Sequence, residues 1–142
     1  MKAFMDTSSL IKLYHQEIDS DTIIEILSDY KIESIILSEL AILEFRSALW
    51  KKVRLQEIEE EPANKVIQCF HNDQNKYEWI SLNYDIVISA LKLIMKYGYS
   101  GLRTLDSLQM ASALIMKDKD CIFLTSDKLL RELFKQEELN IL

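Results

Sequence analysis

The chain has 142 residues, of which 49% are hydrophobic and 28% are charged, and its formal net charge is −6. This length suits one domain, expected to span residues 1–142, and the composition is that of a globular protein with a buried core. The negative charge argues against a protein that coats DNA, because binding to phosphates normally needs a basic surface. It does not exclude a nuclease that neutralises an acidic pocket with metal cations.

The two cysteines, Cys69 and Cys121, lie far apart and form no CxxC pair. Reduced thiols are therefore expected rather than a disulfide framework or a zinc site. Residues 1–6 lack the long apolar stretch of a signal peptide, and no apolar run is long enough to cross a bilayer. We expect a cytoplasmic protein with no membrane partner.

Short apolar strands alternate with helical patterns along the chain. Strands are expected at residues 2–5, 34–37, 78–82, 121–124 and 139–142. Helices are expected at 10–14, 19–30, 38–53, 62–70, 85–97, 104–115 and 128–135, with Ser38 as the N-cap of the long helix 38–53. The alternation predicts an α/β fold, a mainly parallel sheet with helices on both faces.

Acidic residues follow two of the predicted strands. Asp6 comes directly after strand 2–5, and Asp127 closes the segment Thr125-Ser126-Asp127 after strand 121–124. In parallel sheets the pocket lies outside the carboxyl ends of the strands, so both carboxylates are expected at one edge. Asp106 lies near the start of helix 104–115, which is apolar almost all round and should be covered on most sides.

Each acidic residue also has a simple structural explanation. Asp6 and Asp127 each precede a helix and suit N-caps, and Asp106 suits the positive end of a helix dipole. Glu44 is unusual because it sits in the middle of an apolar helix, where a salt bridge with Arg46 or Lys51, or exposure on the polar side of the helix, would explain it. Taken together at one sheet edge, four carboxylates cannot all stay ionised without counter-charge, which Mg²⁺ or Mn²⁺ supplies through oxygen ligands. Such ions polarise phosphate groups, which is chemistry for phosphodiester hydrolysis.

Four ordered segments carry a family resemblance. They are residues 6–14 with Glu17, residues 38–49 around Glu44, residues 102–113 around Asp106, and residues 124–127. The set resembles the signature blocks of PIN-domain ribonucleases, and the match is nearest to the VapC type, the toxins of toxin–antitoxin pairs. Ser107 and Gln109 depart from the family pattern at positions that bear on substrate contacts.

The resemblance implies a three-layer α/β/α PIN fold and cleavage of RNA that depends on Mg²⁺ or Mn²⁺. It makes Asp6, Glu44, Asp106 and Asp127 the catalytic and metal-binding residues. Around them, the hydroxyls expected to orient the carboxylates belong to Thr7, Ser8, Thr125 and Ser126. The resemblance also implies a homodimer and a small cognate antitoxin whose apolar segment occupies a groove between the N-terminal helices.

Basic residues flank these segments. The side chains expected to position RNA by its phosphates belong to Arg46, Lys51, Arg103 and Lys128, with Lys52 and Arg54 in the same basic group beyond Glu44. An ordinary solvated helix end would explain that group equally well.

Two other classes of function stay open. One is a PIN-like module that binds RNA or protein without cleaving it. The other is a phospho-acceptor receiver domain, which expects two adjacent carboxylates after the first strand, where this chain has only Asp6. No glycine-rich phosphate loop and no GxSxG motif occur, which excludes P-loop and acyl-transfer chemistry.

Overall fold

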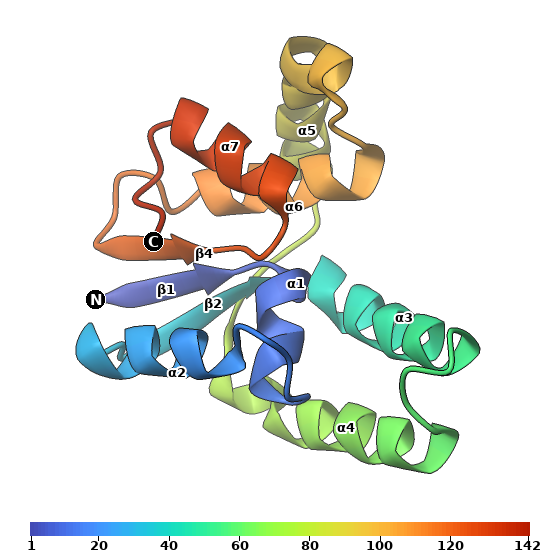
Figure 1. Cartoon of the computed structure of the whole chain (residues 1–142). Coiled ribbons are helices and arrows are strands. Elements are labelled where there is room, and N and C mark those ends of the chain that lie inside the picture. The colour runs from blue at the N-terminus through green and yellow to red at the C-terminus, as the bar shows by residue number, and fades with distance from the viewer.

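Four parallel strands form the centre of the computed structural model, which describes residues 1–142 (Figure 1). They are β1 (Lys2–Met5), β2 (Ser34–Ser38), β3 (Glu78–Ile80) and β4 (Cys121–Leu124), in the spatial order β3-β2-β1-β4. In the register of β1 and β4, Met5 pairs with Leu124, so the carboxyl ends of these neighbouring strands lie level. The predicted α/β fold with a parallel sheet is confirmed.

Seven α-helices flank the sheet. They are α1 (Thr7–Leu10), α2 (Ser20–Asp29), α3 (Leu40–Arg54), α4 (Glu60–Asp73), α5 (Tyr84–Tyr97), α6 (Thr104–Leu114) and α7 (Lys128–Gln136), with 3-10 turns at Ile11–Leu13, Gln74–Lys76 and Gly98–Ser100. Helices α1 to α4 lie on one side of the sheet and α5 to α7 on the other (Figure 1). None of these helices combines the length and the apolar character needed to span a bilayer.

The alternation of side chains along the strands creates two apolar cores. On β1, Ala3 and Met5 join the core beneath α1 to α4, whereas Phe4 joins the core beneath α5 to α7. All four residues of β4 are buried because both faces of that strand are covered. In the first core, the rings of Phe45 and Phe70 stack with their centroids 4.2 Å apart and tie α3 to α4.

Two expected strands differ in the structure. Strand β3 ends at Ile80 rather than residue 82, because the backbone N–H of Leu82 turns to the Glu39 carboxylate, 3.0 Å away. The predicted strand 139–142 is wrong: Ile141 makes one isolated bridge with Phe123. The N–H of Ile141 donates to the carbonyl of Leu139 at 2.8 Å, a local turn that stops the segment from extending along β4.

The expected N-cap at Ser38 is also wrong. Ser38 is the last residue of β2, and the N-cap position of α3 is Glu39, whose side chain makes no capping hydrogen bond. The Ser38 hydroxyl still accepts a 3.3 Å hydrogen bond from Leu40 N–H and a 3.1 Å bond from the Ser112 hydroxyl. Ser38 therefore joins the end of β2 to α6, which helps to fix α6 over the sheet.

Candidate functional site

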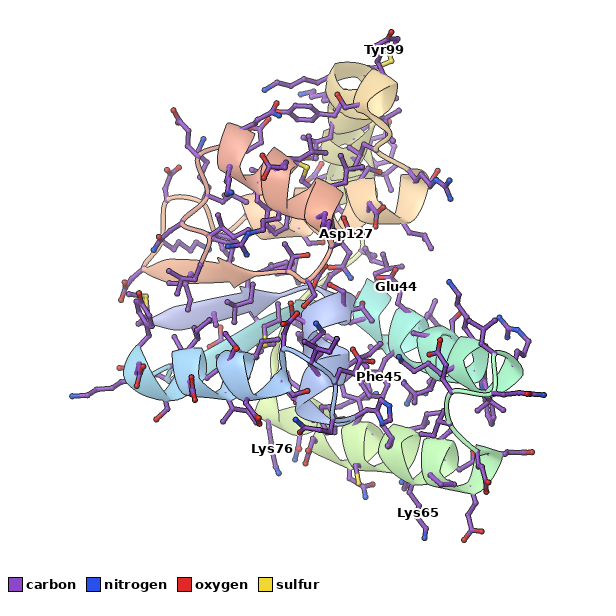
Figure 2. All side chains as sticks on the ribbon, viewed as in Figure 1. Glu44, Phe45, Lys65, Lys76, Tyr99 and Asp127 are labelled. Carbon is purple, nitrogen blue, oxygen red and sulfur yellow. The ribbon has the colours of Figure 1, made fainter.

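The acidic residues gather at the carboxyl ends of β1 and β4. Asp6 directly follows β1, and its N–H donates to the carbonyl of Leu124, the last residue of β4, at 3.2 Å. Figure 2 shows Asp127 at the first turn of α7 and Glu44 in the first half of α3, both at the end of the sheet toward which the strands point. The expectation that one sheet edge collects Asp6 and Asp127 is confirmed.

Asp6 is the most enclosed of these carboxylates, with 2% of its surface exposed. It caps α1 by accepting a 3.0 Å hydrogen bond from Ser9 N–H. The Ser8 hydroxyl lies 2.8 Å from the carboxylate oxygens, and the Thr125 hydroxyl donates to Oδ2 at 2.6 Å. Burial, with a smaller effect from the charge of Asp127, raises the pKa of Asp6 to about 6 in spite of these donors.

Asp127 is held by the same network. It caps α7 by accepting a 2.8 Å hydrogen bond from Leu130 N–H, and its own N–H donates to the Thr125 hydroxyl at 3.1 Å. The Thr125 hydroxyl thus bridges Asp6 and Asp127. The capping explanation is correct for both aspartates, and the caps bring both carboxylates to the shared edge.

Glu44 reaches the cluster from α3. Its Oε1 accepts hydrogen bonds from the Thr7 hydroxyl at 3.0 Å and from Gln109 Nε2 at 2.7 Å. Burial raises the pKa of Glu44, and the negative charge of Asp106 adds to the effect. Glu44 forms no salt bridge, so the alternative of a partner such as Arg46 does not hold.

Asp106 lies in the first turn of α6 and is partly buried. Burial and the charge of Asp127 raise the pKa of Asp106, and Arg103 partly opposes them. The negative charge of Asp127 therefore raises the pKa of both Asp6 and Asp106, and the negative charge of Asp106 raises the pKa of Glu44. The four carboxylates form one connected electrostatic cluster, which we call the acidic cluster.

Three of the four expected hydroxyl groups contact the acidic cluster. Thr7 donates to Glu44, whereas Ser8 and Thr125 donate to Asp6. The Ser126 hydroxyl lies instead 3.4 Å from the hydroxyl of Ser9, and only the backbone N–H of Ser126 enters the network, through Ser8.

The sequence interpretation connected Gln109 with substrate contacts and missed its contact with the acidic cluster. Its side chain is 2% exposed, and Nε2 donates to both Glu44 and the Thr7 hydroxyl, the latter at 3.1 Å. Its Oε1 is buried without a hydrogen-bond partner. A large polar residue one turn after Asp106, in a helix expected to be covered on most sides, was the available signal.

The acidic cluster offers oxygen ligands and lacks cationic partners. None of its four carboxylates forms a salt bridge, and their hydrogen-bond donors are neutral hydroxyl and amide groups. In this conformation no three acidic, histidine or cysteine side chains converge closely enough to hold a metal ion. The uncompensated negative charge of these four carboxylates, with oxygen as the ligand atom, fits a hard divalent cation such as Mg²⁺ or Mn²⁺.

The basic residues expected to contact substrate have different surroundings. Arg103 directly precedes α6, and its positive charge lowers the pKa of Asp106. Lys128 lines a hollow together with Thr125. Arg46 turns to α4, where its guanidinium lies 3.2 Å from His71 Nδ1 and over the ring of Phe70.

Comparison with known proteins places this arrangement in a family. Residues 3–135 match the family described as the PIN domain. The chain belongs to the PIN domain family. The predicted PIN resemblance and three-layer fold are therefore confirmed. No curated protein sequence matches this PIN domain.

Solved structures share the fold of this PIN domain at low sequence identity. The toxin VapC20 of Mycobacterium tuberculosis, described as cleaving the sarcin-ricin loop, is 14% identical, with a TM-score of 0.67 over 93% of this chain and 95% of that one. VapBC-1 of nontypeable Haemophilus influenzae is 14% identical, with a TM-score of 0.67 over 100% and 97%. A toxin-antitoxin complex of Klebsiella pneumoniae is 17% identical, with a TM-score of 0.60 over 85% and 84%. At these identities the likeness shows a common fold.

Proposed function

We propose that this chain, as one PIN domain over residues 1–142, is an endoribonuclease that hydrolyses RNA phosphodiester bonds with Mg²⁺ or Mn²⁺. The observation that carries the proposal is the acidic cluster: four carboxylates at one sheet edge, none of them paired with a lysine or arginine. Bound dications supply counter-charge there and polarise the scissile phosphate.

The carboxylates take different roles in this proposal. Asp6 and Asp106 are the main metal ligands, and Glu44 and Asp127 complete the inner or outer coordination. The hydrogen bonds from Ser8 and Thr125 fix the direction of the Asp6 carboxylate, and those from Thr7 and Gln109 fix that of Glu44. Such contacts behind the ligands hold carboxylates ready, so that little ordering is needed when the cation binds.

RNA is held through its backbone. We assign phosphate contacts to Arg103, beside Asp106, and to Lys128, beside the β4 end of the cluster. Lys51 is an exposed cation farther along α3. Arg46 is less suited to this role because α4 already holds its guanidinium. Contacts of this kind position a strand without reading its sequence.

We further propose that the protein is the toxin of a type II toxin–antitoxin pair, cytoplasmic and homodimeric. Support for the antitoxin comes from the shared fold with VapC20, named as a toxin, and with a toxin-antitoxin complex. Support for the dimer is an apolar stripe along α5, where Val87, Leu91 and Met95 are 51%, 54% and 80% exposed. Leu91→Asp should convert the dimer to a monomer in sedimentation velocity, and an unchanged species would contradict that interface.

The nuclease proposal is tested with a labelled single-stranded RNA incubated with wild-type protein, Asp6→Asn, or Asp85→Asn. Asp85 is an exposed carboxylate in the first turn of α5 and serves as the matched control. Wild type and Asp85→Asn should cleave with Mn²⁺ and stop in EDTA, and Asp6→Asn should not cleave. Cleavage that persists in EDTA or in Asp6→Asn would contradict the proposal. Binding of RNA with no cleavage under any metal would favour the non-cleaving module.

A further inference from the structure

A hollow of about 460 Å³ opens beside the acidic cluster. Its wall includes Thr7, Ser8 and Glu44, so it continues directly from the proposed metal site. On the far side it is lined by Lys12, Lys52 and Glu17. Its volume lies within the range of pockets that hold small ligands, about 300–1,000 Å³. A strand of RNA whose scissile phosphate lies at the acidic cluster has room to extend into this hollow.

The two lysines of the hollow are partly enclosed and already engaged. Lys52 Nζ lies 2.5 Å from Glu17 Oε1 and 3.5 Å from Glu57 Oε2, and its side chain is 21% exposed. Lys12 Nζ lies 2.9 Å from Asp19 Oδ2, and its side chain is 11% exposed. By contrast, the side chain of Lys65 on α4 is 76% exposed and lies far from Glu44 (Figure 2). Lys12 and Lys52 thus form part of the wall of the hollow, each with its ammonium group in an ion pair.

We propose that Lys12 and Lys52 form a phosphate subsite for the RNA backbone next to the scissile bond. In the free protein, Asp19 pairs with Lys12, and Glu17 and Glu57 pair with Lys52; an RNA phosphate takes the place of Asp19 and Glu17 on binding. Lysine binds phosphate as a point charge and needs no fixed hydrogen-bond geometry, so it accepts such an exchange of partners. The inference rests on the RNA-cleaving function proposed above and adds to it the direction in which the RNA backbone leaves the acidic cluster.

The exchange makes a prediction that a purely structural ion pair does not. Removal of either lysine should weaken RNA binding, because one phosphate contact is lost. Removal of a competing carboxylate should strengthen binding, because the ammonium group then has one carboxylate partner fewer. Opposite changes in RNA affinity on removal of the two partners of one ion pair distinguish a phosphate subsite from an ion pair that only stabilises α3.

The experiment measures binding of a labelled single-stranded RNA by fluorescence anisotropy in EDTA over about 0.05–0.3 M KCl. All proteins carry Asp6→Asn, so that the RNA stays intact. Lys12→Gln and Lys52→Gln should each reduce the slope of log affinity against log salt by about 0.7, and weaken binding about fivefold at 0.1 M salt. Lys65→Gln is the matched control, and Lys52→Arg should retain the slope of the protein that carries Asp6→Asn alone. Glu17→Gln should tighten binding about twofold, with melting temperatures recorded for every variant.

Unchanged slopes for Lys12→Gln and Lys52→Gln would overturn the inference, as would weaker binding by Glu17→Gln. If the wild-type chain cleaves RNA while these slopes are unchanged, the nuclease proposal stands and the subsite fails. If the slopes change as expected while the wild-type chain cleaves nothing, the subsite stands as part of an RNA-binding module and the nuclease proposal fails.

Discussion

Asp6→Asn should make the metal-free protein more stable at neutral pH, although it removes a residue that caps a helix. The carboxylate is 2% exposed, and its pKa rises from an ordinary 3.8 to about 6 on folding. Because the folded-state pKa is the higher one, the stability that protonated Asp6 contributes is fully present below about pH 4. It is lost as the pH rises through about 6, where the buried group must ionise.

The pKa difference sets the size of the effect. At 1.36 kcal/mol per pKa unit, the change from 3.8 to about 6 corresponds to about 3 kcal/mol, most of it lost between pH 4 and pH 7.5. Asparagine does not ionise, and its Oδ1 can still accept from Ser9 N–H and cap α1. Its amide suits the Thr125 hydroxyl less well, so a net gain of about 2 kcal/mol is expected at pH 7.5. In a chain of this size that is an increase in Tm of about 4–8 °C.

The assay is thermal and urea unfolding of wild type, Asp6→Asn and Asp85→Asn in EDTA at pH 7.5 and pH 4. Asp6→Asn should be the more stable protein at pH 7.5 and lose that advantage at pH 4, while Asp85→Asn stays within about 0.5 kcal/mol of wild type. Adding Mn²⁺ should raise the Tm of wild type and leave that of Asp6→Asn nearly unchanged. A stability difference between Asp6→Asn and wild type that is the same at both pH values would refute this reasoning.

Three other predictions follow from buried groups. Thr125→Val removes the 2.6 Å hydrogen bond to Asp6 and should lower the free energy of unfolding in urea by about 1–3 kcal/mol at pH 7.5. The loss should be smaller at pH 4, and equal losses at the two pH values would contradict the prediction. Phe45→Ala deletes a fully buried ring stacked on its neighbour and should cost about 3–5 kcal/mol by urea unfolding, whereas a cost below about 1 kcal/mol would contradict the packing described. Burial raises the pKa of Cys121 to about 11, while Cys69 is exposed, so a thiol reagent at pH 8 should label Cys69 rapidly and Cys121 only after unfolding. Rapid labelling of both thiols in the native protein would contradict that assignment.

The layer order and the sheet edge were predictable because they depend on patterns that span many residues. Alternating strands and helices fix a parallel sheet, and the carboxyl ends of parallel strands must meet at one edge. The sequence therefore placed Asp6 and Asp127 at the same edge of the sheet. Asp106 and Glu44 belong to α6 and α3, two helices that pack on this sheet.

Finer features depended on backbone angles and side-chain directions that sequence patterns do not fix. Serine is the better N-cap residue, so the sequence favours Ser38, but β2 extends to Ser38 and the N-cap position of α3 falls on Glu39. Arg46 is two residues after Glu44, which turns it about 200° around the helix and toward α4. Lys52 is eight residues after Glu44 and is turned about 80° from it around the helix, so spacing alone does not show that both side chains line the same hollow.

The central claim is that the acidic cluster exists to bind divalent cations. Crystals grown with Mn²⁺ and measured at the manganese absorption edge test it most directly. We predict an anomalous peak about 2–2.5 Å from carboxylate oxygens of both Asp6 and Asp106, lost in crystals of Asp6→Asn. A map with no peak at the acidic cluster, at a Mn²⁺ concentration that supports RNA cleavage, would contradict the claim.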